Sequence, residues 1–169
     1  MRRLVAVMVG MICFSAAALA DTQRDGDWSV EISSDYAEAY TGNDAGSVLG
    51  FICGEASCAF YIDVGNSCSE GTKIPMLINA ESGSNYVIGT CVHIPVEGKI
   101  QYVNSMQDKD VVVAISSGNV ICFAIPLASG EFKVVKFSLK GALSATDRAI
   151  AARRAVPKVR DTGLRDTVL

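Results

Sequence analysis

Histidine is nearly absent from this chain, and so are the arrangements that common catalytic sites need. The single histidine, His93, would have to serve as the base in any Ser–His–Asp mechanism. No Gly-x-Ser-x-Gly turn accompanies it, and no glycine-rich turn of the phosphate-cradling kind opens a helix. Acidic residues fall mainly in expected loops rather than as the paired carboxylates that glycoside hydrolysis requires. The sequence therefore predicts a protein that is not an enzyme and uses no cofactor.

Basic residues are too few for a nucleic-acid-binding protein. The chain has 15 Lys and Arg against 18 Asp and Glu, and without Arg2 and Arg3 there are 13 basic residues, a net charge of −5. Residues 21–146 carry 7 basic and 15 acidic side chains, whereas residues 147–169 carry 6 and 3. We therefore expect no nucleic-acid partner. The basic C-terminal segment is typical of a solvated surface, with contact to anionic lipid or a polyanion as the alternative.

A long apolar run occurs once, at residues 4–19, after two arginines and before an Ala-Leu-Ala sequence that suits a signal peptidase. It is shorter than the roughly 20 residues that a permanent membrane helix needs. We expect residues 1–20 to be a cleaved signal peptide, with cleavage at Ala20. The mature protein is then periplasmic or secreted and does not span the membrane. A lipoprotein modified at Cys13 is the alternative, but a small residue is missing before that cysteine.

Short runs rich in Val, Ile, Phe and Tyr recur between turns that contain Gly and Ser. This pattern is typical of an antiparallel β-sandwich or barrel rather than of alternating strands and helices. A single mainly β domain is predicted over residues 21–156, because its length is enough for one core. The expected strands are 28–32, 48–53, 58–63, 74–79, 86–94, 100–104, 111–115, 120–127 and 131–139.

Two features of the last strands stand out. Residues 120–126 are apolar throughout, so this strand is expected to lie centrally and to be covered on both faces. In 131–139 the apolar residues change phase between Val134 and Val135, which predicts a β-bulge there.

After Gly141, Ser144 and Asp147 fit a capping box, which predicts one C-terminal α-helix over 145–155. Residues 157–169 are expected to form a flexible tail.

Five cysteines remain after signal cleavage, so two disulfides and one free thiol are expected, in any of fifteen arrangements. Cys53 and Cys58 flank a four-residue connection between two strands, and facing positions at a hairpin favour a disulfide. Cys68 is then paired with Cys91 across the next hairpin. Cys122, in the most apolar strand, is left as a buried, unreactive thiol.

A zinc site is the alternative interpretation of the same residues. Its ligands would be Cys53, Cys58, Cys91 and His93, because Cys91 and His93 are two apart and face the same way on a strand. Export favours oxidation of these thiols instead. No metal site is therefore predicted.

The C-terminal half resembles a known family. The residues that carry the resemblance are Gly118, Phe123-Ala124-x-Pro126-Leu127, and Phe132-x-Val134-Val135-x-Phe137-x-Leu139-x-Gly141-Ala142, followed by an Ala-rich helix. This pattern is similar to the invasion-associated locus B family of small exported bacterial β proteins with paired cysteines, and the likeness covers residues 28–152. It implies an envelope or secreted accessory protein linked to host-cell invasion, with no catalytic residues to carry over.

A shorter likeness concerns Ser82-Gly83-x-x-Tyr86. It resembles the Ser-Gly-x-x-Tyr signature of periplasmic inhibitors of C-type lysozyme, and implies that Ser82 and Tyr86 enter the enzyme's cleft. The second element of that family, an aromatic residue before a Thr-Lys-Gly or Ser-Lys-Gly turn, is missing. The leading hypothesis is therefore an exported binding or accessory protein with an unidentified protein or envelope partner, and the lysozyme inhibitor is the alternative.

Overall fold

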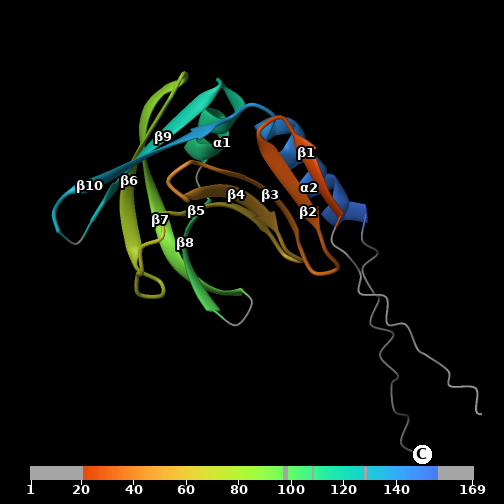
Figure 1. The fold of residues 1–169 in the computed structure, drawn as a ribbon, viewed down its shortest axis with the longest axis horizontal. Helices are drawn as coiled ribbons and strands as arrows, with labels where there is room; N and C mark the ends of the chain where they lie inside the picture. Colours follow the sequence, from red (N-terminus) through yellow and green to blue (C-terminus); the bar gives the residue numbers. More distant parts are fainter. Residues whose placement is uncertain (1–20, 97–98, 108, 128, 156–169) are drawn as a thin grey trace, which may run out of the picture.

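The computed structural model describes residues 21–96, 99–107, 109–127 and 129–155. The predicted signal peptide and the predicted tail at 157–169 lie outside these residues. The structure has the following helices and strands (Figure 1): β1 (Asp21–Asp25), β2 (Trp28–Ile32), β3 (Ala37–Gly42), β4 (Val48–Cys53), β5 (Cys58–Asp63), β6 (Lys73–Ala80), β7 (Gly83–Val96), β8 (Lys99–Met106), α1 (Lys109–Ser116), β9 (Val120–Pro126), β10 (Phe132–Ser138) and α2 (Ala142–Ala155).

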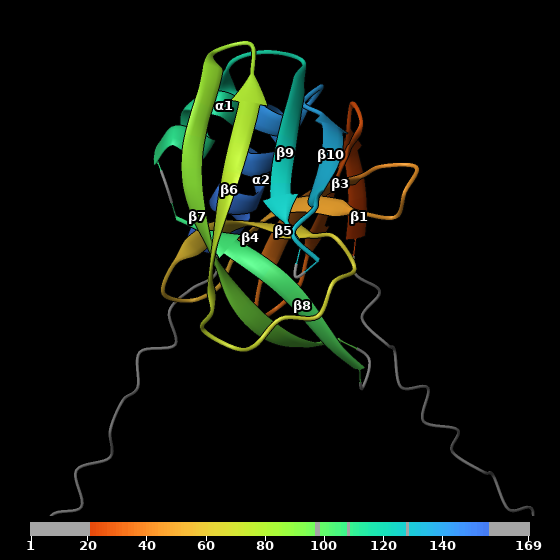
Figure 2. The same ribbon diagram turned by 90° about the vertical axis from the view of Figure 1, so that its left-hand side faces the viewer.

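The strands form one antiparallel sheet in the order β1-β2-β3-β4-β5-β8-β7-β6-β9-β10. The sheet is strongly curled into a half-barrel, so that its two ends enclose one apolar core (Figures 1 and 2). Helix α2 packs on β2 and β3, and α1 packs on β6 and β7. The prediction of a mainly β, antiparallel fold with a C-terminal helix is confirmed. No helix in the described part of the chain is long and apolar enough to cross a membrane.

The two ends of the sheet meet at the turn between β1 and β2. Trp28 is fully buried, and its Nε1 donates a hydrogen bond to the Ser138 carbonyl oxygen at 2.9 Å. The Asp27 amide donates to the Lys140 carbonyl oxygen at 3.0 Å, and the Ser138 hydroxyl donates to the Asp27 carboxylate at 2.6 Å. These bonds join residues more than 100 positions apart and hold the end of β10 against β2.

The prediction of a strand at 111–115 is wrong, because these residues lie in α1. Val111, Ala114 and Ile115 are buried at helical spacing, whereas Val112 and Val113 are exposed. Three consecutive valines favour a strand by propensity. In this segment, however, the residues that contact β6 and β7 recur at helical spacing, so a helix buries them along one stripe.

Two strands were not predicted. β1 has the polar sequence Asp-Thr-Gln-Arg-Asp, which carries no apolar alternation. β3 alternates in burial, but its inward residues Ala37, Ala39 and Thr41 are small because α2 packs directly on this strand. Small inward residues allow this close approach and at the same time weaken the pattern from which strands are predicted.

The expectations for the last two strands also need correction. β9 is second from the sheet edge, and its residues alternate between buried and partly exposed, so it is not covered on both faces. The β9–β10 register runs one to one through Val134 and Val135, without a bulge. Helix α2 begins at Ala142, so Ser144 lies inside the helix rather than at its cap.

A glycine pair tests the contact between the start of α2 and the β1–β2 turn. Gly141 and Gly130 have similar positive φ angles, 92° and 86°. A Cβ at Gly141 would lie 1.9 Å from the Asp25 carbonyl oxygen, whereas a Cβ at Gly130 meets nothing within 4 Å. We expect Gly130→Ala to lower the free energy of unfolding by about 1–2 kcal/mol through backbone strain alone. Gly141→Ala should cost ~3 kcal/mol or more, because backbone must move as well.

Urea unfolding monitored by circular dichroism measures both variants. Equal losses in stability would contradict this account of the contact.

Candidate functional site

The four predicted disulfide cysteines form two disulfides in the structure. Cys53 and Cys58 are directly opposite in the β4–β5 hairpin, with Cα atoms 4.0 Å apart. Cys68 is bonded to Cys91 of β7, with Cα atoms 6.2 Å apart. Disulfides are typical of oxidising compartments, so this pair indicates an extracytoplasmic protein.

These bonds remove the zinc alternative. Cys53, Cys58 and Cys91 are all engaged in disulfides, and no cluster of three metal-ligating side chains occurs among the described residues. Nε2 of His93 lies 2.8 Å from the Cys68 carbonyl oxygen, and its Nδ1 lies 3.3 Å from Glu70 Oε2. His93 therefore supports the loop that carries Cys68.

Among the described cysteines, Cys122 is the one outside a disulfide, but it is not buried as expected. It lies on the outer face of β9 with intermediate exposure, opposite Asn79 of β6 and Lys136 of β10. The prediction failed because the large residues Ile121 and Phe123 occupy the inward positions, which leaves Cys122 in the outward phase.

The residues of the lysozyme-inhibitor likeness lie in a tight hairpin rather than an extended loop. Glu81 and Ser82 form the two-residue turn, since Ala80 pairs with Gly83. Glu81 Oε1 accepts a 3.0 Å hydrogen bond from the Asn119 amide, which fixes this turn to the start of β9. Ser82 is exposed in the turn, and Tyr86 belongs to strand β7.

Tyr86 is part of an apolar row across the outer face of the sheet. The register places Tyr86 beside Leu77, Leu77 beside Ala124, and Ala124 beside Val134. Tyr86, Leu77 and Val134 are 56%, 54% and 67% exposed. The strands of this row are β7, β6, β9 and β10, which face the viewer in Figure 2 with both helices behind them. We call this surface the outer face.

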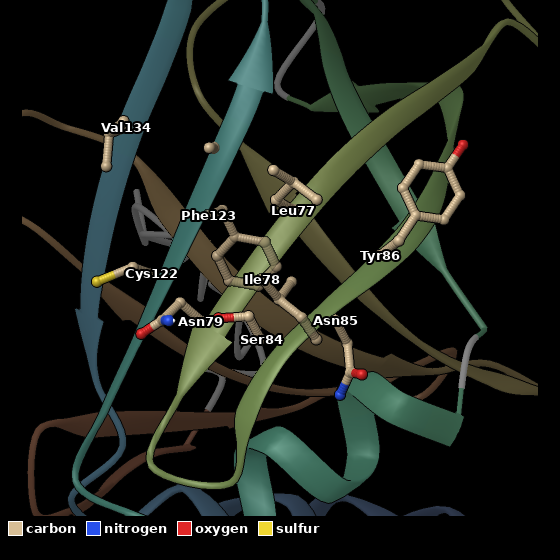
Figure 3. A pocket seen from close by; sticks show the side chains of 10 residues that line it. Leu77, Ile78, Asn79, Ser84, Asn85, Tyr86, Cys122, Phe123 and Val134 are labelled. Atoms are coloured by element: carbon tan, nitrogen blue, oxygen red, sulfur yellow. Dashed lines mark hydrogen bonds between the residues drawn. The ribbon is translucent and has the colours of Figure 1, made fainter.

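The outer face is hollowed around the row. An open depression of about 500 Å³ is lined by residues of all four strands, and Figure 3 shows Leu77, Tyr86, Cys122 and Val134 around it. At its polar end the Asn79 side chain donates to the Ser84 hydroxyl at 2.6 Å. An apolar centre with a polar border is the composition of a protein-binding surface.

The charges on the outer face have one sign. At the outward positions of β6, β9 and β10, and of β7 as far as Ile94, the charged side chains are Lys73 and Lys136. A second depression of about 830 Å³ beside β7 includes Lys73 and Lys109. Residues 21–146 carry 15 acidic and 7 basic side chains, so this face differs from the rest of the domain.

The outer face was not predicted from the sequence, because apolar residues at both even and odd positions of a strand can indicate either a β-bulge or a second apolar face. Phe132 and Val134 alternate with lysines in one phase, and Val135 and Phe137 follow in the other. The structure shows an uninterrupted strand in which Val135 and Phe137 are buried in the core, whereas Phe132, Val134 and Lys136 are exposed. The apolar residues at even positions of this strand therefore belong to an exposed apolar face, and those at odd positions belong to the core.

The other part of the sheet carries two carboxylates that hydrogen-bond to tyrosines. Glu31 of β2 and Glu38 of β3 are directly opposite each other. The Tyr36 hydroxyl donates to Glu31 at 2.5 Å, and this bond, with burial, raises the pKa of Tyr36 to about 12. The Tyr61 hydroxyl donates to Glu38, and burial raises the pKa of Tyr61 above its usual value. These contacts hold β2, β3 and β5 together.

Glu38 should make stability depend on pH. Burial raises the pKa of the Glu38 carboxyl above its usual value, against the opposing effect of the Tyr61 hydrogen bond. A carboxyl whose folded-state pKa is raised is easier to ionise in the unfolded chain. Its contribution to stability is therefore full below the unfolded-state pKa and is lost as pH rises through the folded-state pKa.

We expect Glu38→Gln to match the wild type below about pH 4, near the unfolded carboxyl pKa, and to become more stable than it toward pH 7. Thermal unfolding across this range measures the difference. Glu55→Gln, in the exposed β4–β5 turn, is the matched control and should follow the wild-type profile. A Glu38→Gln variant less stable than wild type at pH 7 would contradict the assignment.

Comparison with known proteins gives a likeness of fold. No protein-family model and no curated protein matches the sequence. The crystal structure of invasion associated protein B from Bartonella henselae matches with a TM-score of 0.55 and 16% sequence identity, over 80% of this chain and 99% of that chain. At this identity the match shows a shared fold. The resemblance to the invasion-associated B proteins, expected from the C-terminal sequence, is thus confirmed at the level of structure.

Proposed function

We propose that the chain is an exported, non-enzymatic protein that binds a protein partner through its outer face, at the cell envelope or outside the cell. The observation that carries this proposal is the in-register row of exposed apolar residues formed by Tyr86, Leu77 and Val134. Contiguous apolar patches on a protein surface mark interaction sites. The two disulfides support a location outside the cytoplasm.

The arrangement of the outer face supports a protein partner. Its apolar centre is bordered by Asn79, Ser84 and Lys136, which can hydrogen-bond to a partner and exclude water from the centre. Aromatic side chains such as Tyr86 are common at the energetically important positions of interfaces. The crystal structure with the similar fold carries the name of an invasion-associated protein, which favours a host or envelope component as the partner.

The contacts of His93 support a function without catalysis. Its ring is already placed between the Cys68 carbonyl oxygen and Glu70, whereas serine or cysteine chemistry would need this ring beside a nucleophile. The free thiol, Cys122, lies opposite Asn79 and Lys136 on other strands.

Leu77→Gln tests the outer face directly, with Leu143→Gln as a matched control. Leu77 is 54% exposed in the row, and Leu143 is 50% exposed on α2. We expect Leu77→Gln to weaken partner binding roughly tenfold or more, since central apolar contacts contribute about 2 kcal/mol. Leu143→Gln should bind as the wild type does.

The measurement is affinity capture from envelope and host-cell extracts with quantitative mass spectrometry, followed by titration of the captured protein. A partner retained by wild type and Leu143→Gln but lost with Leu77→Gln supports the proposal. Equal capture by all three proteins would exclude the outer face as the binding surface.

The lysozyme inhibitor is the second candidate function, because Ser82 and Tyr86 are both exposed on the β6–β7 hairpin. Activity of C-type lysozyme in excess protein separates the two proposals. Inhibition that Ser82→Ala abolishes would support the inhibitor, and full lysozyme activity would remove it.

A further inference from the structure

Strand β10 ends the sheet, and its free edge has a definite hydrogen-bonding pattern. The Leu139 amide donates to Asn119 and the Leu127 amide donates to Glu131, so the odd-numbered residues of β10 bond to β9. The backbone N–H and C=O groups of the even-numbered residues therefore point away from β9. Among the described residues no strand pairs with this edge.

Among the described residues, hydrogen bonds to this edge are found at its C-terminal half. At the C-terminal half, the carbonyl oxygens of Ser138 and Lys136 accept bonds from the Trp28 and Asn43 side chains, at 2.9 and 3.4 Å. The N-terminal half of β10 leads into the β9–β10 hairpin, which extends to the left of the sheet in Figure 1. On its inner side the Lys133 amino group donates to the Val64 carbonyl oxygen, just after β5. Phe132 is 61% exposed. An uncovered apolar edge of this kind favours strand addition.

We propose that a second copy of this chain pairs with this half of β10, antiparallel and centred on Phe132. In this register Phe132 lies opposite Phe132 of the second copy, and Val134 lies opposite the second copy's Gly130. Phe132 offers both its amide and its carbonyl oxygen to the free edge. Gly130 lies in the turn before β10 and its amide already donates to the Leu127 carbonyl oxygen at 3.0 Å, so in the second pair only its carbonyl oxygen is left to accept, from the Val134 amide. Two β10 strands then join the two sheets across a two-fold axis.

Charge complementarity selects this register. It places Lys133 opposite Glu131 of the second copy, twice, because the two-fold axis repeats every contact. Both residues are odd-numbered, so they share the inner side, where the Lys133 amino group donates to the Val64 carbonyl oxygen. Directly opposite charges of unlike sign stabilise a strand pair, and like charges destabilise it.

The neighbouring registers are less favourable. Pairing centred on Lys133 would place two lysines opposite each other. Pairing centred on Val134 would carry the second copy toward Ser138, where Trp28 already occupies the edge. The self-complementary register centred on Phe132 meets neither obstacle.

The pairing goes beyond the proposed function, because it would set the two outer faces side by side and double the binding surface. About five residues of each copy would be in contact, so the buried area would fall in the range of small, transient interfaces, under ~1,200 Å². The dimer should therefore be weak and should form at high protein concentration.

A charge exchange tests the register. Sedimentation velocity of the processed wild-type protein between about 10 and 500 µM, a range suited to weak interfaces, should show an average mass that rises toward the dimer. Glu131→Lys and Lys133→Glu should each weaken association at least tenfold, and the double variant should restore it. Circular dichroism checks the folding of each variant, since Lys133→Glu also removes the contact to Val64. A constant monomer mass for the wild type would overturn the proposal, as would failure of a folded double variant to recover.

A cysteine pair provides a second test that does not depend on affinity. Hydrogen-bonded antiparallel pairs have Cα atoms about 5.5 Å apart, within the range of disulfides. In a Cys122→Ser background, Phe132→Cys should form a disulfide-linked dimer in mild oxidant, whereas Lys136→Cys, outward on the same strand, should not. Equal cross-linking of both variants would overturn the register. Leu77→Gln should leave both assays unchanged, so failure of the proposed binding function is separable from failure of the dimer.

Discussion

The indole of Trp28 makes the contact on which the shape of the molecule depends. It is fully buried and donates to the Ser138 carbonyl oxygen, so it joins the beginning of the sheet to its last strand. The adjacent Asp27 bonds to Lys140 and Ser138, and Gly141 approaches Asp25 too closely for any side chain. Together these contacts close one side of the half-barrel, which keeps the apolar core away from water. They also decide which part of β10 is covered and which part projects into solvent.

This closure explains why the proposed binding surface is on the outside. The inward residues of β6, β9 and β10 are used by the core, and α1 and α2 pack against the strands within the curl. In the described part of the chain, the outer face and the free edge of β10 are the parts of these strands that the core does not use. The exposed Leu77, Tyr86 and Val134 lie outside the core, and the proposed function assigns them to binding.

Much of the fold could be predicted from the sequence, where local pattern and tertiary structure agree. Cys53 and Cys58 occupy facing positions at a hairpin, and the strands at 28–32, 48–53 and 58–63 are found at those positions. Prediction failed where a neighbouring element overrides the pattern. The valines at 111–113 form a helix because the curled sheet offers a surface to one helical stripe, and Ala37 and Ala39 form a strand whose small residues accommodate α2.

The candidate site could be predicted less well, for a physical reason. A strand with apolar residues in both phases can be buried on both faces, or it can contact a core on one face and a partner on the other. Local sequence does not distinguish these cases, because the strand's place in the sheet is set by distant residues such as Trp28. Cys122 was therefore assigned to the core, and the phases of Phe132 and Phe137 were attributed to a bulge.

Native-state hydrogen exchange of β10, measured by NMR at a concentration where the protein is monomeric, tests most directly whether the sheet ends at a half-covered edge. The account predicts alternation: the amides of Val135 and Phe137, which bond to β9, should exchange slowly, and those of Phe132 and Val134 should exchange nearly as fast as in an unfolded chain. Slow exchange at Val134 equal to that at Val135 would show that the edge is covered and would contradict the account, as would fast exchange at all four.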